Sequence, residues 1–288
     1  MKKYLKLAAQ LIKNGTLRNS GQNFNSTRAK SLEILREFIP QNSIYQSDVN
    51  SVRNKKGSRN NLLAQAAFIR SSFRKKGGHL SIQNVGYIRI PKAANTSVSY
   101  AMLMKKYPAL KEKNPDETQI NFLADVNLML VEETESKSFF TVVRNPFARL
   151  VSVYRDFFET TRGHFIYSDY LFGILPQNIS FAEFVSRISR IPDRLKDQHF
   201  KPQHVFSKPY ESKGIVVKYF QLETPLALES FLKENGMELT HRNKSQEAYD
   251  YTQYYTPQLL QQVYEIYQDD VEKFGYHSTY EELKAQLH

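Results

Sequence analysis

The chain has 288 residues, of which 41% are hydrophobic and 24% are charged, and its formal net charge is +11 at pH 7. It contains no cysteine, which excludes disulfide bonds, a thiolate zinc site and a cysteine nucleophile. No stretch approaches the roughly 18 consecutive apolar residues that a membrane-spanning helix requires. These values predict a single soluble domain large enough for an enzyme. Its positive charge suits an anionic ligand, with weak contact to nucleic acid or to an anionic membrane as alternatives.

Residues 1–80 read as a polar and basic lead-in to a predicted domain over residues 81–288. An apolar stretch over residues 4–12 follows two lysines, but Lys6 interrupts it and no small-residue cleavage site follows. We therefore expect an amphipathic basic helix rather than a signal peptide, and a cytoplasmic protein. The basic runs of the lead-in are typical of a solvated or mobile segment, and binding of an acceptor or of a membrane surface is the alternative.

Beyond residue 80, apolar strands alternate with helix starts, which predicts a largely parallel sheet with helices on both faces. The first strand, over residues 87–90, leads through Lys92 into a helix over residues 96–106. Thr96 and Ser97 place two hydroxyl groups at the start of that helix. A helix N-terminus with hydroxyl groups and a nearby ammonium group is an anion-binding site.

A second corner of the same kind follows. Residues 139–143 form an apolar strand, and Arg144 stands at its carboxyl end. Asn145 is a good N-cap, and Pro146 fits the first position of a helix. Ser152 lies about 9 Å further along that helix, at 1.5 Å per residue, within reach of an anion held by the Arg144 guanidinium. The remaining predicted elements are a helix over residues 146–160, a helix capped by Ser180, a strand over residues 215–220, a helix from Pro225 to Gly236 and a last helix from Pro257 to Gly275.

The two corners resemble the sulfotransferases that use 3′-phosphoadenosine 5′-phosphosulfate (PAPS), most closely the carbohydrate group that includes the chondroitin-type enzymes. Residues 91–97 (PKAANTS) fit the family pattern P-K-(A/T)-(A/G)-x-T-S, and residues 144–152 (RNPFARLVS) fit R-(D/N/E)-P-(F/x)-x-R-(L/x)-x-S. The segment HFKPQ at residues 199–203 and the tail over residues 255–276 are similar to two further family segments. The resemblance spans about residues 81–277 and implies a P-loop-like sulfotransferase fold.

The resemblance also implies roles for residues at both corners. The first corner holds the 5′-phosphosulfate in that family, and Lys92 is then expected to neutralise charge on the leaving oxygen. The second corner holds the 3′-phosphate, here through Arg144 and Ser152. Arg149 either contacts the same phosphate or pairs with an acidic side chain, and Arg242 resembles a late segment that returns to the nucleotide. The residues predicted to bind the 5′-phosphosulfate are Pro91, Lys92, Ala93, Ala94, Asn95, Thr96 and Ser97.

Several residues are candidates for the general base, and their spacing does not rank them. His199 comes first, since its segment matches the family and a neutral imidazole suits proton abstraction near pH 7. A buried or acceptor-binding histidine is the alternative role for it. The other candidates for the base are His164, Glu159 and Asp125. Three aromatic side chains either stack on a sugar or pack in the core: Tyr167, Tyr170 and Phe172.

The expected reaction is attack of an acceptor hydroxyl on the sulfur of PAPS with departure of adenosine 3′,5′-bisphosphate, without a metal ion. The resemblance implies a carbohydrate acceptor, the positive charge suits an acidic one, and no specific nucleic acid partner is predicted. A nucleotide-dependent kinase is one alternative, but residues 91–97 contain no glycine and G-x-x-x-x-G-K-(S/T) is absent. A non-catalytic polyanion-binding protein is the other, and it would bind polyanions without selecting a 3′-phosphate.

Overall fold

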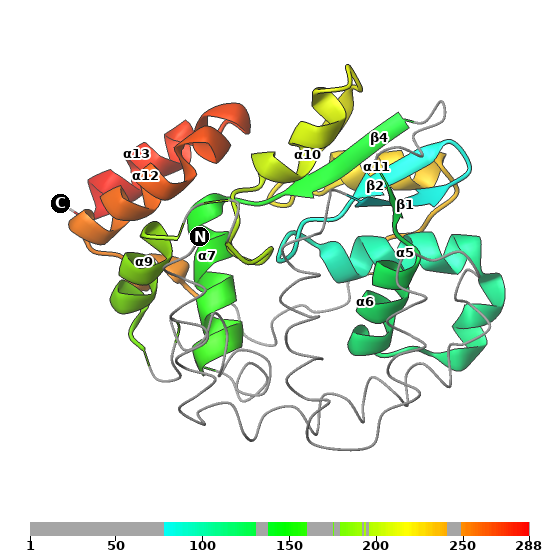
Figure 1. Ribbon diagram of the computed structural model, residues 1–288, viewed down its shortest axis with the longest axis horizontal. Coiled ribbons are helices and arrows are strands. Elements are labelled where there is room, and N and C mark those ends of the chain that lie inside the picture. The colour runs from blue at the N-terminus through cyan, green and yellow to red at the C-terminus, as the bar shows by residue number, and fades with distance from the viewer. Residues whose placement is uncertain are drawn as a thin grey trace, which may run out of the picture.

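The computed structural model describes residues 78–130, 138–159, 175, 179–191, 193, 196–240 and 249–287 (Figure 1). The strands are β1 (Gly78–Ile82), β2 (Val85–Ile88), β3 (Met129–Leu130), β4 (Ser138–Val143) and β5 (Val217–Gln221). They form one five-stranded sheet in the order β3-β1-β2-β4-β5. β2, β4 and β5 are parallel, and β1 is antiparallel to its neighbours β2 and β3. The predicted α/β fold, a largely parallel sheet flanked by helices, is confirmed.

Helices surround this sheet and extend beyond one end of it (Figure 1). They are α5 (Asn95–Lys106), the 3₁₀ turn η2 (Pro108–Lys113), α6 (Glu117–Val126), α7 (Pro146–Tyr154), the π-helical turn η4 (Arg155–Glu159), α9 (Phe181–Ser189), α10 (His204–Glu211), α11 (Leu226–Glu234), the 3₁₀ turn η7 (Tyr251–Tyr254), α12 (Pro257–Lys273) and α13 (His277–Gln286). None of the helices in the described part of the chain is long and apolar enough to cross a membrane.

Alternate side chains of β2 and β4 pack on opposite faces of the sheet, as the two-residue period of a strand requires. Tyr87 and Phe140 stack at 5.0 Å between ring centroids and belong to the apolar cluster under α5, α6 and α11. Ile88 and Phe139 point to the other face, where they meet Tyr210 of α10. Both faces of the central strands are therefore buried, which explains their apolar sequences.

Several helix ends follow the predicted capping residues. The Asn145 side chain accepts hydrogen bonds from the N–H groups of Phe147 (2.9 Å) and Ala148 (3.4 Å) at the start of α7. Ser180 caps α9 in the same way, and Thr256 caps α12. Each such cap contributes roughly 1 kcal/mol, because it satisfies N–H groups that have no partner within the helix.

The element boundaries differ from the prediction in three places. β2 ends at Ile88 rather than at residue 90, so Arg89 already belongs to the loop. The α-helical part of α7 ends at Tyr154, and residues 155–159 continue as the π-helical turn η4. Gly275, with φ at 74°, ends α12 as expected, but α13 begins two residues later and is the last helix.

Short or polar elements were missed altogether. β3 has two residues and β1 has five, so neither strand is long enough to show a clear alternation of apolar and polar residues. α10 contains Pro209, a residue that is unusual inside a helix. Because β1 begins at Gly78, the last residues of the predicted lead-in over residues 1–80 belong to the sheet. The rest of that lead-in, including its predicted amphipathic helix, lies outside the described residues.

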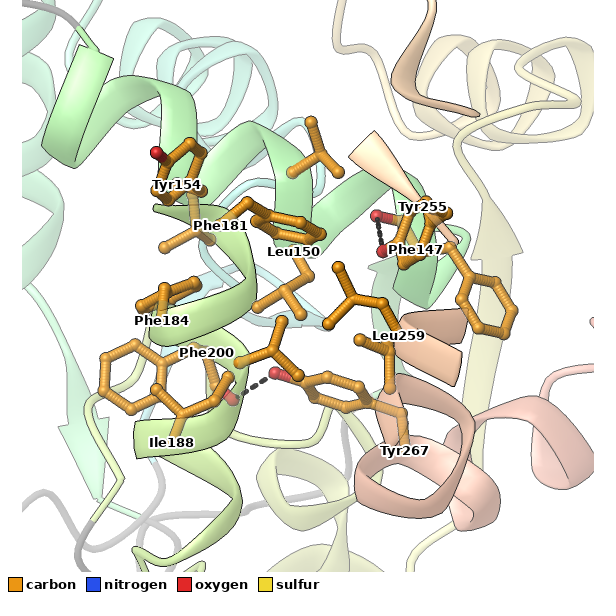
Figure 2. Close-up of a cluster of buried hydrophobic side chains, with 14 of the residues drawn as sticks. Phe147, Leu150, Tyr154, Phe181, Phe184, Ile188, Phe200, Tyr255, Leu259 and Tyr267 are labelled. Carbon is orange, nitrogen blue, oxygen red and sulfur yellow. Dashed lines mark hydrogen bonds between the residues drawn. The ribbon is translucent and has the colours of Figure 1, made fainter. Parts of the chain in front are cut away.

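A second apolar cluster surrounds α7 and joins it to α9, α12 and α13 (Figure 2). Two tyrosine hydroxyl groups tie it to main-chain carbonyl groups: Tyr255 donates to Phe147 at 3.0 Å, and Tyr267 donates to Phe200 at 2.7 Å. The cluster therefore fixes α7 and the segment around Phe200 relative to each other. On the apolar face of α12, Ile266 is partly buried, and four further residues are buried: Leu259, Leu260, Val263 and Tyr267.

Candidate active site

The loop between β2 and α5 enters the helix through two residues with left-handed backbone. Lys92 has a φ of 65°, and Ala94, the N-cap of α5, has a φ of 52°. Such angles cost free energy in residues other than glycine and persist where surrounding structure imposes them, often at ligand sites. Ala93 and Ser97 are buried. The N-cap residue Ala94 makes no side-chain cap at the start of α5, so the N-terminus of this helix is suited to an anion.

A network behind the loop orients the first turn of α5. The Arg89 guanidinium donates to the side-chain oxygens of Asn95 (2.9 Å), Asp125 (2.6 Å) and Asn121 (3.0 Å). Asn121 in turn donates to the Thr96 hydroxyl oxygen at 3.1 Å. Because the Thr96 oxygen accepts this bond, its own proton is directed to another acceptor. The network thus prepares Thr96 to donate a hydrogen bond.

Lys92 forms an ion pair with a residue that follows α7. Its Nζ atom lies 2.5 Å from Oδ2 of Asp156, and the two side chains are 22% and 37% exposed. The main-chain oxygen of Lys92 accepts a hydrogen bond from the Arg144 guanidinium at 3.3 Å. This contact is possible because β2 and β4 are adjacent parallel strands, with Ile88 paired to Thr141. The two predicted phosphate corners therefore lie side by side at the carboxyl ends of these strands.

The main chain of Arg144 is held by Gln203. The Gln203 side chain accepts from the Arg144 N–H at 2.9 Å and donates to the Arg144 carbonyl at 2.7 Å. Gln203 is fully buried, and its own N–H donates to the Asp270 carboxylate at 2.6 Å. These bonds fix the point at which the Arg144 side chain leaves the sheet.

Tyr249 lies between two arginines beside α7. Its hydroxyl group accepts from the Arg144 guanidinium at 3.4 Å, and the Arg155 guanidinium stacks 3.9 Å from the centre of its ring. Ser152 is half-buried on α7, one turn before Arg155. The second corner therefore contains two guanidinium groups and a tyrosine in addition to the predicted serine.

Arg149 is almost completely buried, with 2% of its surface exposed. Its guanidinium donates to three main-chain carbonyl groups: Pro91 at 3.0 Å, Lys201 at 2.9 Å and Gln198 at 3.1 Å. Burial lowers the pKa of this guanidinium. These hydrogen bonds go to the main chain rather than to an acidic side chain, the partner that the sequence left open.

His199 is paired with a buried carboxylate. Its Nδ1 atom lies 2.6 Å from Oδ1 of Asp197, and the same oxygen accepts the His199 main-chain N–H at 2.9 Å. Asp197 is 3% exposed, and the His199 ring packs edge-on against Phe157 at 5.0 Å. Since a carboxylate only accepts hydrogen bonds, Nδ1 carries the proton of a neutral imidazole, and Nε2 is the nitrogen that can take one. The general base predicted from the sequence requires an imidazole oriented in this way.

The sulfotransferase family model matches residues 82–277. The chain belongs to the sulfotransferase family. Searches of curated proteins and of solved structures gave no match. The match covers both predicted phosphate corners, the His199 segment and all of α12. The protein is accordingly a sulfotransferase in the general sense, an enzyme that transfers sulfuryl groups.

The alternative candidates for the base in this sulfotransferase are engaged elsewhere or are not described. Glu159 accepts the Tyr254 hydroxyl at 2.8 Å and the Arg155 guanidinium at 3.2 Å. Asp125 pairs with Arg89, as described above. Several predicted residues lie outside the described residues: His164, Tyr167, Tyr170, Phe172 and Arg242.

Sequence reasoning missed several residues of the sulfotransferase site. Gln203 is the last residue of the HFKPQ segment, and Asp197 stands two residues before His199, so the HFKPQ motif could have drawn attention to both. No motif in the sequence pointed to Asp156 or Tyr249, because their partners are distant in the chain. Among the described residues, no group of three or more His, Asp or Glu side chains could hold a metal ion.

Proposed function

We propose that this sulfotransferase takes a sulfuryl group from PAPS and transfers it to a hydroxyl group of a carbohydrate, releasing adenosine 3′,5′-bisphosphate (PAP). The observation that carries the proposal is the contact between the two corners: the Arg144 guanidinium lies 3.3 Å from the main-chain oxygen of Lys92. A nucleotide with phosphates on both sides of one ribose needs two anion sites close together. Ligands of open α/β sheets bind at the carboxyl ends of the strands, where both corners lie.

The first corner would hold the 5′-phosphosulfate. The N-terminus of α5 and the Thr96 and Ser97 hydroxyl groups are donors for its oxygens, and Lys92 supplies the charge. Asp156 keeps the Lys92 ammonium beside the loop. Lys92 is then placed to neutralise the oxygen from which the sulfuryl group departs.

The second corner would hold the 3′-phosphate. Arg144, rigidly positioned by Gln203, and Ser152 on α7 are the predicted ligands. Arg155 adds a second guanidinium group, joined to Arg144 through Tyr249. Two guanidinium groups favour a dianionic phosphate over the uncharged ribose hydroxyl that 5′-AMP presents at the same place.

His199 would act on the acceptor. The acceptor hydroxyl oxygen forms a bond to sulfur, its proton passes to Nε2 of His199, and the bond between sulfur and the phosphate oxygen breaks with its electron pair remaining on PAP. Asp197 holds the imidazole and stabilises the imidazolium that results. Like phosphoryl transfer, this reaction depends on positioning and charge neutralisation.

The carbohydrate acceptor is proposed from the resemblance of the sequence to the carbohydrate sulfotransferases. The net charge of +11 favours an acidic glycan among carbohydrate acceptors.

Calorimetric titration of PAP, with 5′-AMP as the comparison, tests the donor. We expect PAP to bind tightly, 5′-AMP to bind much more weakly, and Arg144→Ala to remove most of the difference. Arg190→Ala is the control, because Arg190 is exposed at the end of α9, outside the two corners. Equal affinity for both nucleotides in the wild-type protein would refute the 3′-phosphate site. Transfer from radiolabelled PAPS to a panel of neutral and acidic glycans then tests the acceptor class.

A further inference from the structure

The buried guanidinium of Arg149 joins two segments that are distant in sequence. Pro91, whose carbonyl accepts from Nε at 3.0 Å, directly precedes Lys92. Gln198, whose carbonyl accepts from one terminal nitrogen at 3.1 Å, directly precedes His199. The Lys201 carbonyl accepts from the other terminal nitrogen at 2.9 Å. One side chain thus connects the main chain beside both predicted catalytic residues.

Burial of the Arg149 charge costs free energy, and the geometry of the guanidinium explains why a charged side chain is present here. Removing an ion from water costs several kcal/mol, which good hydrogen bonds only partly offset. Among the described residues, the hydrogen bonds of Arg149 go to main-chain carbonyl groups, and the nearby Asp270 and Asp197 carboxylates favour its charge only through space. A well-packed apolar side chain on this face of α7 would satisfy the core at lower cost. The rigid fork of a guanidinium, however, holds three carbonyl groups in one fixed arrangement.

A second connection runs through the π-helical turn η4. Asp156 pairs with Lys92 at 2.5 Å, and the neighbouring Phe157 packs against the His199 ring at 5.0 Å. Arg149 and η4 therefore both connect the same helical segment to the Lys92 loop and to the segment around His199. Single π-helical turns often occur at functional sites.

We propose that Arg149 is a positioning residue that couples the Lys92 loop to His199, so that occupation of the donor site sets the placement of the imidazole. This inference rests on the proposed function. It replaces the direct phosphate contact that the sequence left open for Arg149 with a main-chain coupling. Arg149 itself does not touch the reacting atoms in this arrangement.

Nuclear magnetic resonance of the histidine rings tests the coupling without an acceptor. The protein has 7 histidines, so the His199 signal is assigned by its loss in His199→Ala. We expect PAP to shift the His199 ring signals in the wild-type protein. Arg149→Lys keeps the charge but cannot hold three carbonyl groups, so PAP should still bind while the His199 shift is lost. An unchanged His199 response in Arg149→Lys overturns the inference.

Controls separate this result from a loss of stability and from failure of the proposed function. Tyr154→Phe on the same helix removes another buried bond, from the tyrosine hydroxyl to the Ile179 carbonyl at 2.8 Å, and should leave the His199 response intact. Failure of PAP to bind the wild-type protein would refute the proposed donor instead. Once a glycan acceptor is identified, Arg149→Lys should lower turnover by about 100-fold without a matching rise in KM. This is the loss expected when the imidazole is misplaced by about 1 Å.

If Arg149→Lys does not fold, hydrogen exchange in the wild-type protein decides the question. The N–H groups of Phe200 and Lys201 donate to the Asp197 carbonyl at 3.2 and 2.8 Å. We expect PAP to slow exchange at these two amides as well as over residues 91–97. Protection confined to residues 91–97 overturns the inference.

Discussion

The pairing of His199 with Asp197 makes a quantitative prediction for the substitution Asp197→Asn. Asparagine keeps the size of the side chain and an oxygen that can accept the His199 main-chain N–H, now 2.9 Å from Oδ1. It removes the negative charge that lies 2.6 Å from Nδ1. The local turn should therefore persist while the imidazolium formed during transfer loses its anionic partner.

The size of the effect follows from the burial of the pair. Opposite charges about 4 Å apart attract by about 4 kcal/mol at an effective dielectric constant near 20. The net contribution of a hydrogen bond to a charged group is smaller, about 1.5–3 kcal/mol, because water also solvates the separated groups. The His199 side chain is 22% exposed, which places the pair inside that range. A loss of about 2 kcal/mol corresponds to about a 30-fold fall in turnover.

Initial rates of transfer from radiolabelled PAPS to the glycan acceptor measure this effect, with PAP affinity followed by calorimetry. We expect turnover to fall and PAP affinity to change little, because the proposed mechanism assigns Asp197 to His199 and assigns other residues to the phosphates. Asp193→Asn is the matched control, since Asp193 is exposed and pairs with Lys196 instead. Turnover of Asp197→Asn within about two-fold of wild type, where a loss near 30-fold is expected, would refute the role of the pair in proton transfer.

Two further predictions concern Lys92 and His204. Lys92→Ala should raise the barrier by about 3 kcal/mol, which lowers turnover by about 100-fold or more in the same transfer assay, and near-normal turnover would contradict the assignment. The hydrogen bond to Asp270 raises the pKa of His204 above its usual 6.5, so its stabilising contribution is fully present below pH 6.5 and is lost as the pH rises through the folded-state pKa. Urea unfolding should therefore show a larger deficit for His204→Asn at pH 5.5 than at pH 8.5, and an equal deficit at both would argue against a protonated His204.

Features that depend on a few neighbouring residues could be predicted from the sequence. Asn145 caps α7 because its side chain reaches N–H groups two and three residues away. The apolar strand β4 and the helix after it were recognised for the same reason. Asp197 stands only two residues before His199, yet it was not predicted. A single short-range hydrogen bond between side chains leaves no periodic pattern in the sequence.

Features that depend on distant partners could not be predicted. Gln203 pairs with Arg144 across 59 positions, and Tyr249 meets it across 105. Whether α7 continued as an α-helix or as the π-helical turn η4 was likewise undecided by its residues, because the contacts of Asp156 and Phe157 with Lys92 and His199 come from other segments.

By itself, the sequence determined the two strand–loop–helix corners and their membership of one α/β domain, because caps, strand ends and helix starts are local properties. The tertiary structure decided what those corners form together. The parallel pairing of β2 with β4 brings Lys92 and Arg144 into contact, and burial within the core places the Arg149 guanidinium among main-chain carbonyl groups of distant segments. The physical reason is that a buried polar side chain must find its partners in the folded state, and those partners are chosen by the packing of segments far apart in the chain.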